Sequence, residues 1–283
     1  MTNTVTVTEQ NNTVSILEDA PVVTPDPWYT GLTTLATSSG SVVVTADTAA
    51  HTKGAWTEII ASNAADTSAL LVYPQYTGVN GNNTATLLDV GTGAAGAETV
   101  VAGDIAIGGL SGTYLAFGYL IPIKITNSTR IAARIQSIVT GGKTATVDLR
   151  TFAMGNVTTV PTSVDVLGTS TATSAGTNVG FASYTEVVAS TAQEYGAIIA
   201  VPSYSSAGGS TNVSPSLFVA TGSAGNETDI AQVLYRESTA EAVYHGGPNS
   251  SWVTAANIPA GTRLSAKTST SDVWVTLIGV PLT

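Results

Sequence analysis

Two arginines and four glutamates recur at matching places in the two halves of the chain. Arg130 and Arg263 each follow a threonine at the start of a predicted strand, and the acids that recur with them are Glu58, Glu186, Glu98 and Glu227. A guanidinium is a rigid fork of donors that fits a carboxylate, so this combination either ties strands and loops together or binds a carboxylate or sugar. Because both copies keep these charges in a chain with only 10% charged residues, we expect structural ion pairs.

Enzyme chemistry has little support. Paired carboxylates could serve a glycosidase, but such sites need aromatic platforms, and aromatic residues are only 6% of the chain. A Ser/His/Asp triad would have to use His51 or His245, and no serine lies in a Gly-x-Ser-x-Gly nucleophile elbow. The glycine-rich run 91–96 is followed by neither Lys-Ser/Thr nor a helical pattern, which argues against a phosphate-binding loop. We therefore predict a protein that is not an enzyme and has no catalytic residue.

Composition argues against several kinds of partner. The chain has 9 Lys and Arg against 19 Asp and Glu, a net charge of −10, so it lacks the basic stripe of a nucleic-acid-binding protein. With no cysteine and two histidines, we expect no metal site and no cofactor. No apolar run reaches the length of about 18 residues that a membrane-spanning helix needs. The residues that follow Met1 also lack the charged and apolar regions of a secretory signal.

An internal repeat supplies the elements that must position the arginines and glutamates. Residues 56–62, Trp-Thr-Glu-Ile-Ile-Ala-Ser, match residues 184–190, Tyr-Thr-Glu-Val-Val-Ala-Ser, 128 positions later. Further blocks match in the same order: 69–74 with 197–202, 88–98 with 217–227, 125–134 with 258–267, and 147–149 with 275–277. The offset changes between 128 and 133 in loops and in the last hairpin, where insertions are tolerated. The chain is therefore predicted to be one unit used twice, at 28–155 and 156–283.

Each unit holds about seven or eight short β-type runs separated by Gly, Ser and Asn, the spacing of a β-sandwich or barrel. The predicted fold is all-β: an N-terminal extended arm followed by two tandem, duplicated β-sandwich domains of the jelly-roll type. An immunoglobulin-like topology is the alternative, although the Cys-Trp-Cys pattern is absent. The best candidate for a short helix is Thr228–Arg236. Strands of the first unit are expected at Ser41–Thr45, Trp56–Ala61, Ala69–Tyr73, Thr86–Val90 and Thr144–Thr151.

Residues 1–27 form the predicted arm. Two alternating runs, Thr4–Thr8 and Thr13–Leu17, flank a turn, and a proline-rich linker follows. A hairpin of this size is marginal by itself in water. We expect it to dock on another chain, with a frayed terminus as the alternative. The apolar positions that would anchor it are Val5, Val7, Val14 and Ile16.

Aromatic residues fall into two groups. Trp56 occupies the position of Tyr184 in the repeat and is predicted to be a core residue. Tyr244, His245 and Trp252 lie in a part of the second unit that does not match the first. Because function concentrates in loops, a loop at these three residues is the predicted place for recognition of a surface glycan.

The chain resembles structural proteins of tailed bacteriophages. The arm segment Thr4–Val14 is similar to virion-anchoring N-termini of phage fibre proteins. The segment Ile258–Lys267 is similar to a short sequence that is common in phage head-decoration and fibre-like β-domains. The cysteine-free composition rich in Thr, Ser, Ala, Val and Gly fits the same class.

The resemblance implies a virion protein assembled in the host cytoplasm. One assignment is a capsid decoration or cement protein, a homotrimer whose partner is the major capsid protein. The other is a fibre or adaptor bound to tail or neck proteins. A carbohydrate-binding module or adhesin, with a host-surface glycan as its ligand, is the reading from a different class.

Overall fold

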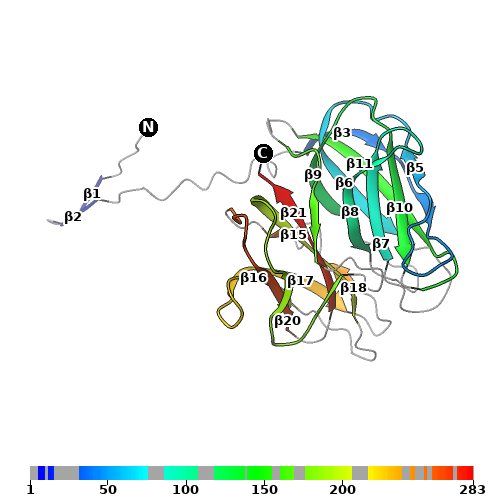
Figure 1. Cartoon of the computed structure of the whole chain (residues 1–283). Coiled ribbons are helices and arrows are strands. Elements are labelled where there is room, and N and C mark those ends of the chain that lie inside the picture. Colours follow the sequence, from blue (N-terminus) through cyan, green and yellow to red (C-terminus); the bar gives the residue numbers. More distant parts are fainter. Residues whose placement is uncertain are drawn as a thin grey trace.

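Figure 1 presents a computed structural model of the chain. The structure describes residues 6–9, 12–15, 32–75, 86–107, 118–137, 139–154, 160–168, 176–205, 216–237, 243–245, 252–253, 257–269 and 273–282.

The arm contributes a hairpin. Strands β1 (Thr6–Glu9) and β2 (Asn12–Ser15) pair antiparallel, with Val7 opposite Val14, and form a two-stranded sheet of their own. The other two predicted anchor positions, Val5 and Ile16, lie outside the described residues. Docking of the arm on another chain stays a prediction.

The first unit folds into two antiparallel sheets. One has the order β5-β10-β7-β8, and the other has the order β3-β11-β6-β9 with β4 also paired to β11. The bounds are β3 Leu32–Ser38, β4 Val42–Thr45, β5 Thr57–Ile60, β6 Thr67–Gln75, β7 Thr86–Thr92, β8 Thr99–Ile107, β9 Tyr119–Ile125, β10 Ile131–Ser137 and β11 Thr144–Met154.

The second unit has the same two sheets. Their orders are β14-β20-β16-β17-β18 and β12-β21-β15-β19, with β13 also paired to β21. The bounds are β12 Asp165–Leu167, β13 Thr177–Val179, β14 Thr185–Val188, β15 Tyr195–Ser205, β16 Ser216–Thr221, β17 Thr228–Glu237, β18 Val243–His245, β19 Trp252–Val253, β20 Leu264–Thr268 and β21 Val273–Pro281.

The strand order identifies the topology. If β3 and β4 count as one strand, the sheets of the first unit read 1-8-3-6 and 2-7-4-5 along the chain, and the second unit reads the same with β18 added beside β17. Strands distant in sequence therefore lie side by side, which is the double Greek key of an eight-stranded jelly roll. The predicted tandem jelly-roll sandwiches are confirmed, and the immunoglobulin-like alternative is wrong.

Two details differ from the sequence-based expectation. Thr228–Arg236 is not helical but lies in β17, where β16 supplies its hydrogen-bonding partner and Leu217 stands opposite Val233. Pairing of this kind overrides a weak helical preference. The strands β3 and β8 were not predicted. Strand β3 is rich in Thr, and the apolar run of β8 is interrupted by Gly103-Asp104, so neither shows a clean alternation of apolar and polar residues.

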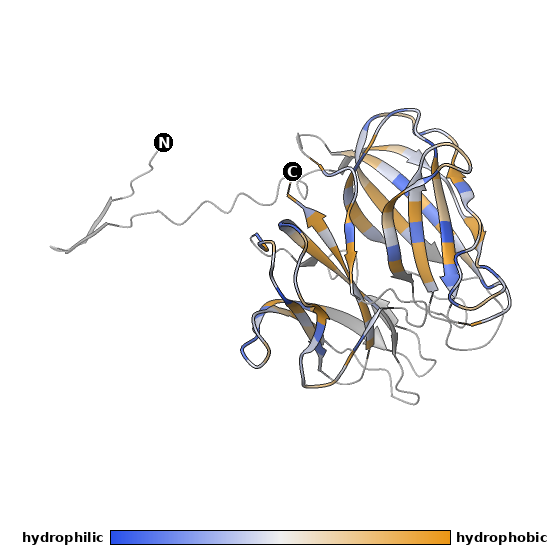
Figure 2. Ribbon diagram, in the orientation of Figure 1, coloured by the Kyte–Doolittle hydropathy of each residue, from blue (hydrophilic) through white to orange (hydrophobic). Residues whose placement is uncertain are grey.

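The apolar side chains form two clusters, and one of them crosses between the units. Stripes of apolar and polar residues alternate along the strands of the first unit (Figure 2). Its cluster continues into the second unit through Val164, Ala197, Ile199, Val201, Ile278 and Val280. Two backbone hydrogen bonds reinforce this contact: Val164 N to Val101 O at 3.0 Å and Lys124 N to Pro161 O at 2.8 Å. The two jelly rolls are thus joined by a shared core.

Candidate functional site

The first of two arginine clusters is centred on Arg130, directly before β10. Its Nε donates to Oε2 of Glu58 at 2.8 Å, and its Nη1 donates to Oε1 of Glu98 at 2.8 Å and to the carbonyl of Gly93 at 3.3 Å. The second oxygen of Glu98 accepts the N–H of Gly96 at 2.9 Å. Glu58 stands on β5 and Glu98 directly before β8. One guanidinium therefore holds β5, β10 and the turn between β7 and β8.

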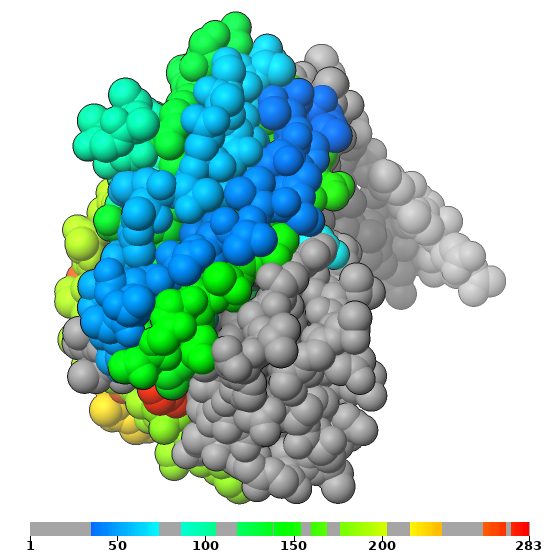
Figure 3. Space-filling view, turned by 90° about the vertical axis from the view of Figure 1, so that its right-hand side faces the viewer, coloured from blue at the N-terminus to red at the C-terminus, as the bar shows by residue number. Residues whose placement is uncertain are grey.

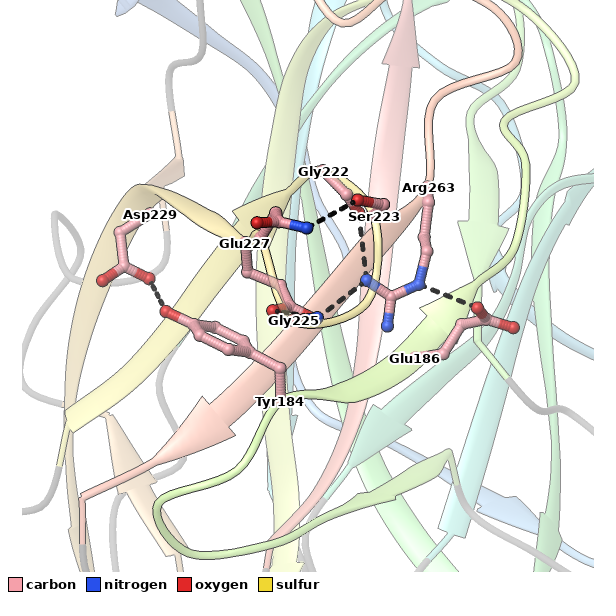
Figure 4. A network of polar contacts seen from close by, with 9 residues as sticks. Tyr184, Glu186, Gly222, Ser223, Gly225, Glu227, Asp229 and Arg263 are labelled. Atoms are coloured by element: carbon pink, nitrogen blue, oxygen red, sulfur yellow. Dashed lines mark hydrogen bonds and ion pairs between the residues drawn. The ribbon is translucent and has the colours of Figure 1, made fainter.

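The second arginine cluster repeats this geometry around Arg263, directly before β20 (Figure 4). Its Nε donates to Oε2 of Glu186 at 2.8 Å, and its Nη1 donates to Oε1 of Glu227 at 3.1 Å and to the carbonyl of Gly222 at 3.0 Å. The N–H of Gly225 donates to the other oxygen of Glu227 at 2.9 Å. All four contacts of the first cluster thus have a counterpart here.

Glycines shape the turns that carry Glu98 and Glu227. Gly93 and Gly222 have φ values of 123° and 114°, a region that glycine alone adopts readily. A Cβ at Gly93 would lie 2.9 Å from the carbonyl oxygen of Ala97, and one at Gly222 would lie 2.5 Å from that of Asn226. The glycine-rich run 91–96 and its counterpart at Gly222 therefore serve to turn the chain toward an arginine.

The two carboxylates in each cluster differ in exposure. The side chains of Glu98 and Glu227 are 2% and 9% exposed, whereas those of Glu58 and Glu186 are 51% and 49% exposed. Burial acts to raise the pKa of Glu98, but the hydrogen bonds from Arg130 and from backbone N–H groups outweigh it, so its pKa lies below the ordinary value. The same balance lowers the pKa of Glu227.

The pKa values of the two arginines are raised. A hydrogen bond to Glu58, then one to Glu98, raises the pKa of Arg130, and a hydrogen bond to Glu186 does the same for Arg263. Both oxygens of Glu98 and Glu227 already accept hydrogen bonds from the protein. A carboxylate or sugar ligand would have to displace a protein partner, which favours the structural role over the ligand-binding one.

A further ionic group surrounds Asp89 of β7 and was not predicted. Lys53 Nζ donates to Oδ1 of Asp89 at 2.6 Å and to Oδ1 of Asp104 at 2.5 Å, and Arg134 Nε donates to Oδ2 of Asp89 at 2.8 Å. The guanidinium of Arg134 also lies 4.5 Å from the ring centre of Trp56. Trp56 is half-buried and packs against this cation, so its prediction as a core residue is wrong.

The second unit replaces this ionic group with aromatic contacts. By the repeat, Asp89 corresponds to Phe218, Arg134 to Lys267 and Trp56 to Tyr184. Lys267 Nζ lies 4.3 Å from the ring centre of Tyr184 and 5.2 Å from that of Phe218, and the hydroxyl of Tyr184 donates to Asp229. The hydrogen bond with Tyr184 is the main cause that raises the pKa of Lys267. The sequence signals for these arrangements are the cation and the aromatic residue that recur in both copies and the difference between the copies at position 89.

The predicted recognition loop is not a loop at its named residues. Tyr244 and His245 lie on β18, which pairs with β17, and Trp252 lies on β19, which pairs with β15. The two strands belong to opposite sheets of the sandwich. Each pairs at the edge of its sheet, which satisfies backbone groups on the paired side. Glycan recognition by these residues stays a prediction.

Within the described ranges, no group of three or more His, Asp or Glu side chains is placed to hold a metal ion. The same part of the chain contains no helix that is long and apolar enough to cross a membrane.

No family model and no curated protein sequence matches this chain. Among solved structures, PNGF-II is similar in its P21 crystal form at 9% identity and a TM-score of 0.37, over 84% of this chain and 65% of that one. In its C2 crystal form the identity is 8% and the TM-score is 0.39, over 86% of this chain and 65% of that one. The chain thus spans less than two thirds of PNGF-II.

A third solved structure, the STIV MCP, is similar at 13% identity and a TM-score of 0.30, over 85% of this chain and 94% of that one. All three TM-scores are low, so these likenesses assign neither an activity nor a partner to this chain.

Proposed function

We propose that the chain is a non-enzymatic structural protein of a virus particle and serves as a capsid decoration or cement protein. The observation that carries the proposal is the shared core between two jelly rolls. Val101 of β8 packs with Ile199 and Ile278 of the second unit in one apolar cluster, so the units form one block. Two units joined by a continuous apolar core are suited to covering a surface, whereas enzymes with domain-closing steps need an interface that opens.

The charged side chains fit a scaffold of this kind. In both arginine clusters and around Asp89, the charged side chains form ion pairs that link strands and turns. Surface loops fixed in this way keep their shape without a ligand. Such pre-ordering favours a protein that binds neighbours through a fixed surface over one that changes conformation around a substrate.

Attachment is assigned to the arm at residues 1–27. Its hairpin, β1 and β2, is a two-stranded sheet with backbone groups available at its edges. Strand addition to the major capsid protein would use these main-chain groups and needs little sequence specificity. We propose that three copies associate as a homotrimer on the capsid, and that assembly takes place in the host cytoplasm.

The test is binding of the full chain and of a chain without residues 1–27 to purified particles from which the protein has been stripped. The full chain should rebind in numbers close to those of the major capsid protein, and the truncated chain should not. Rebinding in a small fixed number per particle would favour a fibre or adaptor of the tail or neck. Equal rebinding of the truncated chain would overturn the role of the arm.

A further inference from the structure

The contact between the two units uses one face of one sheet. Along β15 and β21, side chains alternate between two sides. Ile198, Ala200 and Leu277 point into the core of the second unit. Their neighbours Ala197, Ile199, Val201, Ile278 and Val280 join the core of the first unit and are at most 3% exposed. The outer face of this sheet is therefore covered by the first unit, whose strand β8 contributes Val101.

The first unit has an equivalent face, which we name the open face. It consists of the outward side chains of β6, β9 and β11, with Leu71 opposite both Leu120 and Arg150, and Phe152 opposite Ala69. These correspond through the repeat to the covered positions: Ala69 to Ala197, Leu71 to Ile199, Tyr73 to Val201, Arg150 to Ile278 and Phe152 to Val280.

The open face is mainly apolar, with Ala69 buried and the larger side chains partly exposed. Leu71, Tyr73, Leu120 and Phe152 are half-buried. On the neighbouring strands β3 and β4, Leu35 is 49% exposed and Val43 is 55% exposed. Figure 3 shows these two strands, in blue, crossing the side of the molecule that faces the viewer. Contiguous exposed apolar residues of this kind mark interaction surfaces.

The second unit in turn carries the counterpart of the covering strand. Strand β17 occupies the place of β8, and Ile230 occupies the place of Val101. Val101 is only 8% exposed because the second unit covers it, whereas Ile230 is half-buried. Among the described residues, β18 pairs only with Tyr235–Glu237, so the first half of β17 remains a sheet edge.

Each of the two surfaces carries one charge that has a partner inside its own unit. Arg150 takes the place of Ile278 in the open face, is 44% exposed and donates from Nη2 to Oδ2 of Asp148 at 2.8 Å. Asp229 takes the place of Val100 and accepts a hydrogen bond from the hydroxyl of Tyr184. Val100 is itself 39% exposed, so this position lies outside the internal contact. The apolar side chains of the two surfaces are therefore the ones available for a contact between copies.

We propose that the open face of one copy binds the β17 edge of a second copy, so that chains associate head to tail through a repeat of the contact inside the chain. Such an interface is heterologous, and it forms a ring if the rotation between copies closes and a filament if it does not. This inference does not depend on a place in a virus particle.

Sedimentation of the full chain across a concentration series tests the proposal. Leu71→Asp places a charge in the open face, and Ile230→Asp places one on the edge. Each single variant should weaken association by at least about tenfold, because a charge would have to be buried in an apolar contact. In a mixture of the two variants, the intact edge of one chain can still bind the intact open face of the other, so the mixture should form dimers and nothing larger. Phe181→Asp, a control at a residue that is 58% exposed in the second unit and outside both surfaces, should associate as the wild type does.

Thermal unfolding of each variant separates loss of association from loss of folding, which matters because Ile230 also packs against the core of its own unit. A wild-type chain that stays monomeric up to its solubility limit would overturn the proposal. So would weakening by Leu71→Asp without any effect of Ile230→Asp, since that pattern indicates two open faces packed against each other.

Discussion

At the scale of residues, each arginine cluster joins two strands and a turn through one guanidinium, which binds one exposed and one buried carboxylate. Exposed ion pairs contribute little to stability, because water and salt screen them. The buried carboxylates, Glu98 and Glu227, are expected to contribute more to stability than the exposed ones, because each accepts hydrogen bonds from a guanidinium and from a backbone N–H. The stability carried by a cluster should therefore depend mainly on the buried acid.

Replacement of the arginine should expose this asymmetry. We expect Arg263→Ala to lower the Tm by several degrees, since Glu227 would keep its charge without its cation. Arg263→Lys should recover only part of the loss, because an ammonium cannot bridge two carboxylates as a planar fork does. The control is Lys124→Ala on β9, an exposed lysine, which should change stability by less than about 0.5 kcal/mol. Equal effects of Arg263→Ala and Lys124→Ala in thermal unfolding would contradict the role of the cluster.

The lowered pKa values of Glu98 and Glu227 predict a dependence of stability on pH. Each folded-state pKa lies below the ordinary glutamate value of 4.5, so the folded chain binds fewer protons than the unfolded chain between the two pKa values. The stabilisation is then complete above about pH 4.5 and is lost as the pH falls through the folded pKa. Urea midpoints measured from neutral to acidic pH should fall less steeply for a Glu98→Gln, Glu227→Gln double variant. Parallel curves for the two proteins would argue against this linkage.

At the scale of elements, the two glycines in the turn between β16 and β17 differ in how much the turn depends on them. Gly222 and Gly225 both have positive φ, but only at Gly222 would a Cβ meet the backbone, 2.5 Å from the carbonyl of Asn226. We expect Gly225→Ala to cost about 1 kcal/mol for its left-handed φ. Gly222→Ala should cost more and should displace Glu227 from Arg263. Chemical denaturation of the two variants gives the comparison, and equal costs would contradict the account of this turn.

The sequence revealed the elements that the repeat preserves. The duplicated jelly roll and the partners of Arg130 and Arg263 could be predicted, because both copies keep the same residues at the same spacing. The group around Asp89 could not, because the second unit replaces it with Phe218 and Lys267. The shared core could not be predicted either, because the local sequence does not distinguish Ile199, which faces the other unit, from Ile198, which faces the core of its own unit. That choice depends on which surface the other unit covers.

At the scale of the whole molecule, the shared core should make the two units unfold together. Calorimetry of the wild-type chain is expected to give one transition. Ile199→Ala removes a side chain that is 0% exposed between the units and should cost about 2–5 kcal/mol. Leu71→Ala at the equivalent half-buried position should cost less. Two separate transitions in the wild type would show that the units are not one cooperative block.

The measurement that tests the proposed role in a virus particle most directly is a cryo-EM reconstruction of the particles to which the chain is proposed to belong. We expect density for tandem jelly rolls on the outer surface of the capsid, joined to the major capsid protein by an added strand from residues 1–27. Particles that lack this density, with the chain found only in the soluble fraction of infected cells, would contradict a structural role in the virion.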